Sequence, residues 1–242
     1  MKLTAITSLR PALLLAVCLA PAASAALIYT SGPLNLLIPD DTETGLVRTL
    51  DVAESFAVGS VTLNLNLSVP AGTTGWAGDL YAYLQHDTGF SVLLNRPGRT
   101  AGNPFGYGDG QAMAISLRDD AVNGDLHSYR TVATGSENVA LSNPLADAWQ
   151  PDGRITDPAS VVTGDPRNAL LGQFIGADSA GTWTLFIADL SGGSQFQLDS
   201  WALQITPIPE PATFGAMSGL ALLVLALWRR ASSNRTNGVQ HS

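Results

Sequence analysis

The sequence predicts an all-β protein whose main body is an antiparallel β sandwich. In the segment 60–69, apolar side chains occupy every second position and polar side chains fill the positions between them, the pattern of a strand with one buried face. The apolar positions are Val61, Leu63, Leu65, Leu67 and Val69. Helical periodicity is nearly absent from the body, and clusters of Gly, Pro, Asn and Asp separate short apolar runs. Short strands joined by turns favour a sandwich over a parallel α/β sheet.

Five further segments are predicted as strands: 79–84, 91–95, 112–117, 182–188 and 196–205. Within the last of them the alternation of apolar residues shifts by one position: Leu198 has an even residue number, whereas Trp201 and Leu203 have odd ones. One extra residue near Asp199 and Ser200 would return both sets to the core, so we predict a β-bulge there. The polar stretch 129–166 contains four prolines and is expected to be a long loop excursion.

The first 25 residues have the parts of a secretory signal peptide. Two basic residues precede an apolar run over 11–20, and the small residues 23–25 form a cleavage site. We therefore expect signal peptidase to cut after residue 25 and the body, 26–206, to be exported. A lipoprotein signal at Cys18 is the alternative, although the bulky Val17 before it disfavours that interpretation.

The C-terminal end has the features of a membrane segment. The proline-rich residues 207–211 are followed by 212–228, which carry no charge and form a predicted transmembrane helix near the lower length limit for spanning a bilayer. Arg229 and Arg230 would stop that helix and hold the basic tail, 229–242, in the cytoplasm. The body would then face away from the cytoplasm.

A short motif precedes this helix: Pro209, Glu210 and Pro211. The order of motif, short apolar helix and basic stop resembles the PEP-CTERM sorting signal of Gram-negative bacteria. That resemblance implies an inner-membrane intermediate, recognition by an exosortase, and delivery to the cell surface or the extracellular matrix of a biofilm together with exopolysaccharide. Prolines keep the motif extended and free of sheet hydrogen bonds, so we expect it to be a processing signal. The alternative is a plain membrane tail.

Composition excludes several classes of function. Between residues 26 and 206 there are nineteen acidic side chains against seven arginines and no lysine, a net charge of −12. This field repels phosphate backbones, so nucleic-acid binding is not expected. The single cysteine, Cys18, falls within the signal peptide. The mature body therefore has no thiol for catalysis, metal binding or a disulfide.

Several motifs of the body resemble those of the P domain (Homo B domain) that follows the catalytic domain in kexin- and furin-like subtilases. They are Ile38-Pro39-Asp40-Asp41, Gly78-Asp79-Leu80, Arg96-Pro97-Gly98, Gly181-Thr182-Trp183-Thr184-Leu185, Asp189 and Leu198-Asp199-Ser200-Trp201-Ala202-Leu203. The resemblance implies a jelly-roll-like sandwich that stabilises an attached protease. Because the body begins directly after the predicted signal peptide, we expect no attached protease here. The sequence also departs from the family near Thr74 and at Ala177, where the family often has a histidine and a glutamate.

No catalytic apparatus is visible, and we do not expect an enzyme. The chain has no Gly-x-Ser-x-Gly elbow and no His-Glu-x-x-His helix. His86 and His127 lack a surrounding motif and are interpreted as surface or turn residues. Trp183 and Trp201 lie on the apolar parity of their strands and are expected in the core.

Two sets of residues remain as candidates for binding. Four aspartates flank a predicted strand and are candidates for a calcium site, the only cofactor considered, with turn-forming aspartates as the alternative. They are Asp109, Asp119, Asp120 and Asp125. Trp76 and Tyr107 lie in glycine-rich turns and are candidates for an exposed ligand surface.

Two hypotheses of function follow. The first is a non-catalytic surface or extracellular-matrix protein that contacts proteins or polysaccharide through its sandwich. The second is a secreted hydrolase, or an accessory subunit that stabilises a separately encoded subtilase.

Overall fold

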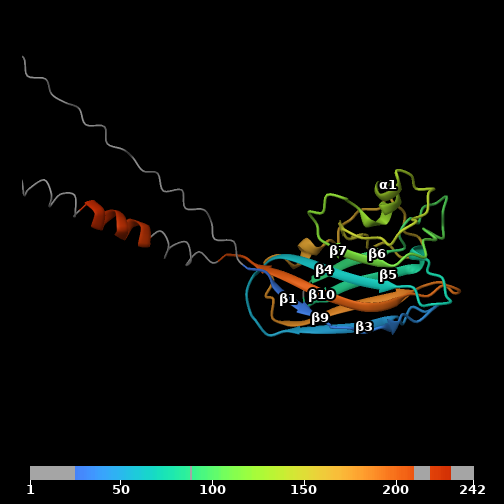
Figure 1. Ribbon diagram of the computed structural model, residues 1–242, viewed down its shortest axis with the longest axis horizontal. Coiled ribbons are helices and arrows are strands. Elements are labelled where there is room, and N and C mark those ends of the chain that lie inside the picture. The colour runs from blue at the N-terminus through green and yellow to red at the C-terminus, as the bar shows by residue number, and fades with distance from the viewer. Residues whose placement is uncertain (1–24, 88, 210–218, 230–242) are drawn as a thin grey trace, which may run out of the picture. The chain divides into compact units, whose positions relative to one another are not determined.

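The computed structural model describes residues 25–87, 89–209 and 219–229 (Figure 1). The chain divides into a unit at Ser24–Ile208, which contains every named strand, and a second unit made of the two end segments. The predicted signal peptide up to residue 24, the motif residues Glu210 and Pro211, the stop residue Arg230 and the tail beyond it lie outside the described residues.

Two sheets form the sandwich. The first has the order β1-β10-β4-β7-β8, with β2 also paired to β10, and the second has the order β3-β9-β5-β6. The strands of the first sheet are β1 (Leu27–Thr30), β2 (Leu36–Leu37), β4 (Val58–Ser68), β7 (Met113–Leu117), β8 (Ala148–Trp149) and β10 (Gln197–Pro207). Those of the second are β3 (Leu46–Val52), β5 (Leu80–His86), β6 (Gly89–Asn95) and β9 (Gly181–Asp189). The strand pairs are antiparallel except β7 with β8, which confirms the predicted fold class.

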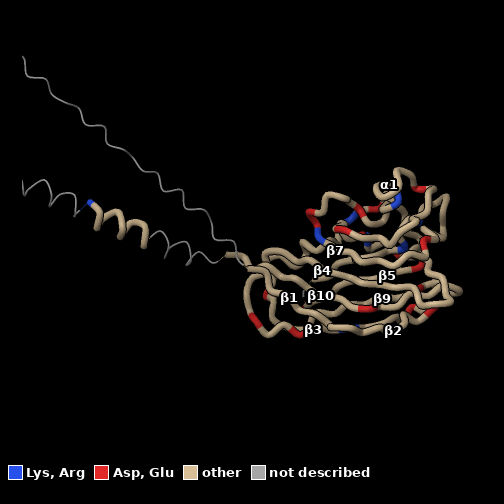
Figure 2. The backbone as a smooth tube through the Cα atoms, in the orientation of Figure 1, with Lys and Arg blue, Asp and Glu red and all other residues tan. Residues whose placement is uncertain are grey.

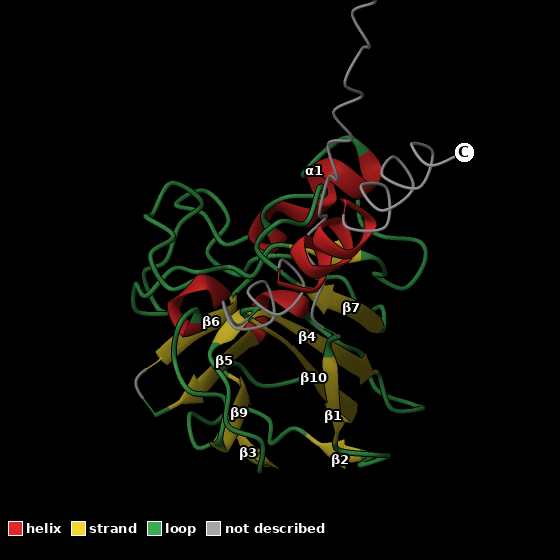
Figure 3. Ribbon diagram, turned by 90° about the vertical axis from the view of Figure 1, so that its left-hand side faces the viewer, coloured by secondary structure: helices red, strands yellow, loops and turns green. Residues whose placement is uncertain are grey.

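Helical structure in the sandwich unit is limited to short turns. They are η1 (Ala77–Asp79), η2 (Leu126–Ser128), α1 (Tyr129–Thr134) and η3 (Leu171–Phe174). Figures 1 and 3 show α1 and long loops gathered beyond the β6 and β7 strands. We call the loops and turns of 96–175 the loop lobe.

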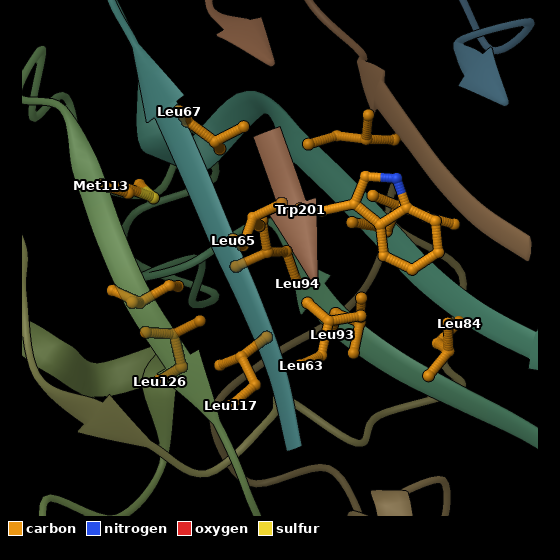
Figure 4. Close-up of a cluster of buried hydrophobic side chains, with 14 of the residues drawn as sticks. Leu63, Leu65, Leu67, Leu84, Leu93, Leu94, Met113, Leu117, Leu126 and Trp201 are labelled. Atoms are coloured by element: carbon orange, nitrogen blue, oxygen red, sulfur yellow. The ribbon is translucent and has the colours of Figure 1, made fainter. Parts of the chain in front are cut away.

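The core lies between the two sheets. Leu63, Leu65 and Leu67 of β4 point into it beside Trp201 of β10 (Figure 4), and each is at most 1% exposed. Trp183 enters from β9 and is fully buried. The strict alternation read in the sequence therefore marks the buried face of β4, and the expectation that both tryptophans belong to the core is confirmed.

The predicted β-bulge is present in β10. The register of β10 with β4 is regular up to Leu198 and shifts between Leu198 and Ser200, after which Trp201 pairs with Leu65. Both Leu198 and Trp201 are buried. The extra residue of the bulge therefore lets the apolar side chains on both sides of it point into the core, as the side-chain alternation of a strand requires.

The predicted excursion over 129–166 is mostly irregular, with α1 and β8 as its only named elements in the described chain. It is nevertheless well packed, because Tyr129, Trp149 and Val161 are buried. Strands β1 and β3 were absent from the sequence prediction. Most of their inward-facing side chains are only half-buried, and the exposed Ile28 and Val47 on their outer faces obscure the alternation of apolar and polar residues.

The predicted transmembrane helix over 212–228 lies partly outside the described residues. The described portion contains a helix over 219–229, and no helix within 25–87, 89–209 or 219–229 has the length and apolar character needed to cross a bilayer.

Candidate functional site

Aromatic side chains gather on the outer face of the second sheet. Tyr83 of β5 stacks on Phe186 of β9 with ring centroids 4.8 Å apart, and Phe90 of β6 lies 5.0 Å from Tyr83. Tyr81 extends the row and lies 6.3 Å from Phe186. We call these four residues the aromatic face. Three neighbouring strands thus contribute rings to one continuous surface.

The aromatic face remains open to solvent. Phe90 is 38% exposed, and Tyr81, Tyr83 and Phe186 are half-buried. The strand register surrounds the rings with uncharged side chains: Val47 pairs with Phe186, and Thr184 pairs with Gln85. Exposed apolar clusters of this kind mark interaction sites on soluble proteins. Aromatic rings next to hydroxyl and amide groups suit a ligand that has both an apolar face and polar edges.

The sequence prediction missed this surface although the signal was present. The buried face of β5 is formed by Leu80, Ala82 and Leu84. Because side chains alternate along a strand, Tyr81 and Tyr83 must lie on the outer face. Phe186 has the same relation to its buried neighbours in β9. The pattern that predicts this surface is a set of large aromatic side chains at the outward-facing positions of two paired strands.

The ligand surface proposed from Trp76 and Tyr107 needs correction. Trp76 is partly exposed and donates from Nε1 to the Phe105 carbonyl at 2.9 Å. Tyr107 is only 1% exposed, because its ring packs against Tyr129 and under the Arg130 guanidinium. Glycine-rich flanking sequence indicated a turn, but the aromatic ring of that turn points into the protein.

The four aspartates proposed for calcium do not come together. Asp109 accepts hydrogen bonds from Tyr129 and Arg130, while Asp119 accepts the backbone N–H groups at the start of η3. Asp120 pairs with Arg118 at the surface, and Asp125 pairs with Arg154. Each carboxylate therefore has a separate structural partner. Among the described residues, no group of three or more His, Cys, Asp or Glu side chains is arranged to hold a metal.

A buried network of charges organises the loop lobe, where six of the seven arginines of the body are found, as the basic positions in Figure 2 indicate. Arg154, with its side chain 2% exposed, contacts Asp125 at 2.6 Å and Asp152 at 3.1 Å. Asp152 is fully buried and also meets the Nδ1 atom of His127 at 2.8 Å. Alternating positive and negative groups thus connect η2 to the loop that follows β8.

His127 is fully buried, which corrects its interpretation as a surface residue. Its Nδ1 faces the Asp152 carboxylate and its Nε2 faces the Arg99 carbonyl at 2.9 Å. Both partners are acceptors, so only the doubly protonated ring donates to both. Burial on its own lowers the pKa of His127, but the Asp152 hydrogen bond and charge outweigh burial and raise this pKa above its ordinary value.

His86 is also buried rather than at the surface. Its ring lies flat on Trp183, with centroids 4.1 Å apart and an interplanar angle of 2°, and both nitrogens face carbonyl oxygens of residues 178 and 182. Both histidines of the sandwich unit therefore have their nitrogens engaged in structural contacts. Neither presents a nitrogen to a substrate.

Three of the family-like motifs meet at one end of the sandwich. Asp79 is in η1 and Asp189 ends β9, and the Leu190 N–H donates to the Asp79 carbonyl at 2.9 Å. Asp40 follows β2, and the Thr42 N–H donates to the Asp189 carbonyl at 3.0 Å. We call Asp40, Asp79 and Asp189 the acidic end.

The electrostatics of the acidic end are unusual. Arg96 donates from Nε to the Gly78 carbonyl and approaches Asp79 at 3.3 Å. Asp189 is fully buried, and neither of its carboxylate oxygens has a hydrogen-bond partner. Burial, followed by the negative charge of Asp79, raises the pKa of Asp189 to about 7. An unpaired carboxylate in this position is costly unless something neutralises it.

Comparisons with known proteins give limited similarity. No family model and no curated protein matches the chain. Among solved structures, a serine protease of Aeromonas sobria is similar over 78% of this chain and 28% of its own, at 16% identity and a TM-score of 0.42. A structure of that protease in complex with a chaperone is similar over 77% of this chain and 27% of its own, at 16% identity and a TM-score of 0.42. This chain therefore spans less than a third of the matched chains.

Proposed function

We propose that this chain is an exported, non-catalytic surface or extracellular protein that binds polysaccharide through the aromatic face. The observation that carries the proposal is the row of half-exposed rings from Tyr81 to Phe186 on the outer side of the second sheet. A pyranose ring has an apolar C–H face, which packs against the electron-rich face of an aromatic side chain. The hydroxyl groups at its edges would find the threonine and glutamine side chains beside the rings.

A polysaccharide is favoured over a protein partner because the strands that carry the rings place no charged side chain among them. Protein interfaces concentrate binding energy in aromatic and arginine anchors that enter pockets. The outer face of β5 and β9 offers no arginine that could serve as such an anchor. A row of rings along three neighbouring strands suits an extended sugar chain.

The engagement of the two buried histidines supports a non-catalytic role. His127 is held between Asp152 and a carbonyl oxygen, and His86 lies between two carbonyl oxygens. General acid–base catalysis requires a group within reach of a substrate proton. A candidate base with no exposed surface does not meet that requirement.

The location of the protein rests on the two end segments. We propose export by the signal peptide and exosortase-dependent sorting at Pro209-Glu210-Pro211 to the surface of a Gram-negative cell. Mass spectrometry of protein recovered from the native host tests the sorting step: wild type is expected to lose residues 212–242, and Glu210→Ala is expected to retain them. Retention in both proteins would leave only the plain membrane tail.

Affinity gel electrophoresis tests the binding function. The Phe90→Ala variant is expected to lose about fivefold in affinity for a retarding polysaccharide, since one aromatic contact contributes about 1 kcal/mol. Phe105→Ala is the matched control, because Phe105 is 65% exposed but does not belong to the aromatic face. It should bind like wild type.

The polysaccharide panel should include the host's own exopolysaccharide and neutral glucans. If wild type is retarded by none of them, or if the two variants bind equally, the aromatic face is not a glycan site. Specific capture of a subtilase through the same face would instead favour the accessory-subunit hypothesis.

A further inference from the structure

The acidic end carries more negative than positive charge when its three aspartates are ionised. Three carboxylates, Asp40, Asp79 and Asp189, share the site with one guanidinium, that of Arg96, which leaves two negative charges. Asp189 is fully buried with both oxygens unpartnered, and Asp79 is only 6% exposed. Isolated buried charges are rare because losing their hydration costs several kcal/mol. A bound positive group would remove this cost.

The available donors define the chemistry of that group. The side chains that meet here offer carboxylate oxygens, and the adjoining turns add a serine hydroxyl from Ser191 and backbone carbonyls. Oxygen-only sites suit hard cations, and calcium accepts six to eight such ligands in irregular geometry, with carbonyls and water completing the shell. A net charge of two negative units matches one divalent ion.

We propose that the acidic end binds Ca²⁺, with Asp79 and Asp189 as the buried carboxylate ligands and Asp40 as a third ligand from the rim. Because no three metal-ligating side chains of the described residues already surround one point, Asp40 has to move inward on binding. It is exposed and follows the two-residue strand β2, so its carboxylate is free to do so once it releases the Gly193 N–H.

Solvent reaches the acidic end at Asp40. Asp40 lines a solvent-open pocket of about 360 Å³ together with Thr73, Thr74 and Gln195. The same loops are already held to one another, since Gln195 N–H donates to the Thr74 carbonyl at 2.7 Å. The ion would therefore join three loops whose backbones are largely in position, and it would stabilise the folded state alone.

Thermal unfolding of the full-length chain tests the proposal in a mildly alkaline buffer. Millimolar calcium chloride is expected to raise the melting temperature by about 5 °C or more relative to EDTA, because a ligand that binds only the folded state stabilises it. Asp189→Asn and Asp79→Asn should abolish this shift. Asp120→Asn, which neutralises an exposed aspartate of the loop lobe, is the matched control and should keep it.

A further variant keeps the proposal testable if the substitutions at the buried Asp79 and Asp189 prevent folding. Asp40→Asn changes an exposed side chain, so it should melt like wild type in EDTA but require at least tenfold more calcium for half of the shift. No calcium-dependent shift in wild type would overturn the proposal. The proposal would also be overturned by a second outcome. In that outcome, Asp40→Asn and at least one folded variant of Asp79 or Asp189 show the same calcium-dependent rise in melting temperature as wild type.

Discussion

Replacing Arg154 with alanine is expected to lower the free energy of unfolding by about 3–5 kcal/mol, because it removes the buried guanidinium that pairs with both Asp125 and Asp152. The Arg154 side chain is 2% exposed, Asp152 is fully buried, and Asp125 is mostly buried. The guanidinium also donates to the Thr163 carbonyl at 2.6 Å, which holds the later part of the loop lobe. Urea unfolding followed by circular dichroism measures the loss.

The chain offers a direct control for this prediction. Arg118→Ala removes an ion pair of similar geometry, but its side chain and that of Asp120 are 37% and 80% exposed. Exposed pairs contribute about 0–1 kcal/mol, so this variant should remain close to wild type. Equal losses in the two variants would mean that the buried network does not stabilise the loop lobe.

The fold was predictable where local pattern and burial agree. The alternation of apolar residues in β4 identified its buried face, and the shift of that alternation in β10 located its bulge. Strands β1 and β3 were missed because most of their inward-facing side chains are only half-buried, and exposed apolar residues such as Ile28 and Val47 interrupt the alternation. The order of the strands in the two sheets is a property of long-range pairing, which no short stretch of sequence encodes.

The sites were less predictable because they depend on which residues meet in space. The calcium hypothesis considered aspartates close in sequence, yet those four have separate partners, whereas Asp40, Asp79 and Asp189 lie far apart in the chain and meet at one end of the sandwich. His127 could not be interpreted as buried without knowing that Asp152 lies beside it. In contrast, Tyr81 and Tyr83 were identifiable from parity alone.

The stability contributed by His127 is expected to be complete in mild acid and lost as the pH rises. In the folded protein the pKa of His127 lies above 6.5, its ordinary value, because Asp152 and the Arg99 carbonyl both accept from the ring. The folded state therefore binds the proton more tightly than the unfolded state, and stability falls as the pH increases through the folded-state pKa. Above the folded-state pKa, one nitrogen of the His127 ring has lost its proton and no longer donates a hydrogen bond.

Urea unfolding of wild type and His127→Gln over about pH 5 to 9 measures this contribution as a difference. Groups common to both proteins, including Asp189, cancel in that difference. Below pH 6.5 wild type should be more stable by about 1.5–3 kcal/mol, the contribution of a buried hydrogen bond between charged groups, and the gap should narrow at higher pH. A gap that stays constant across the range would mean that His127 does not change its charge there, and that the ring is held by packing alone.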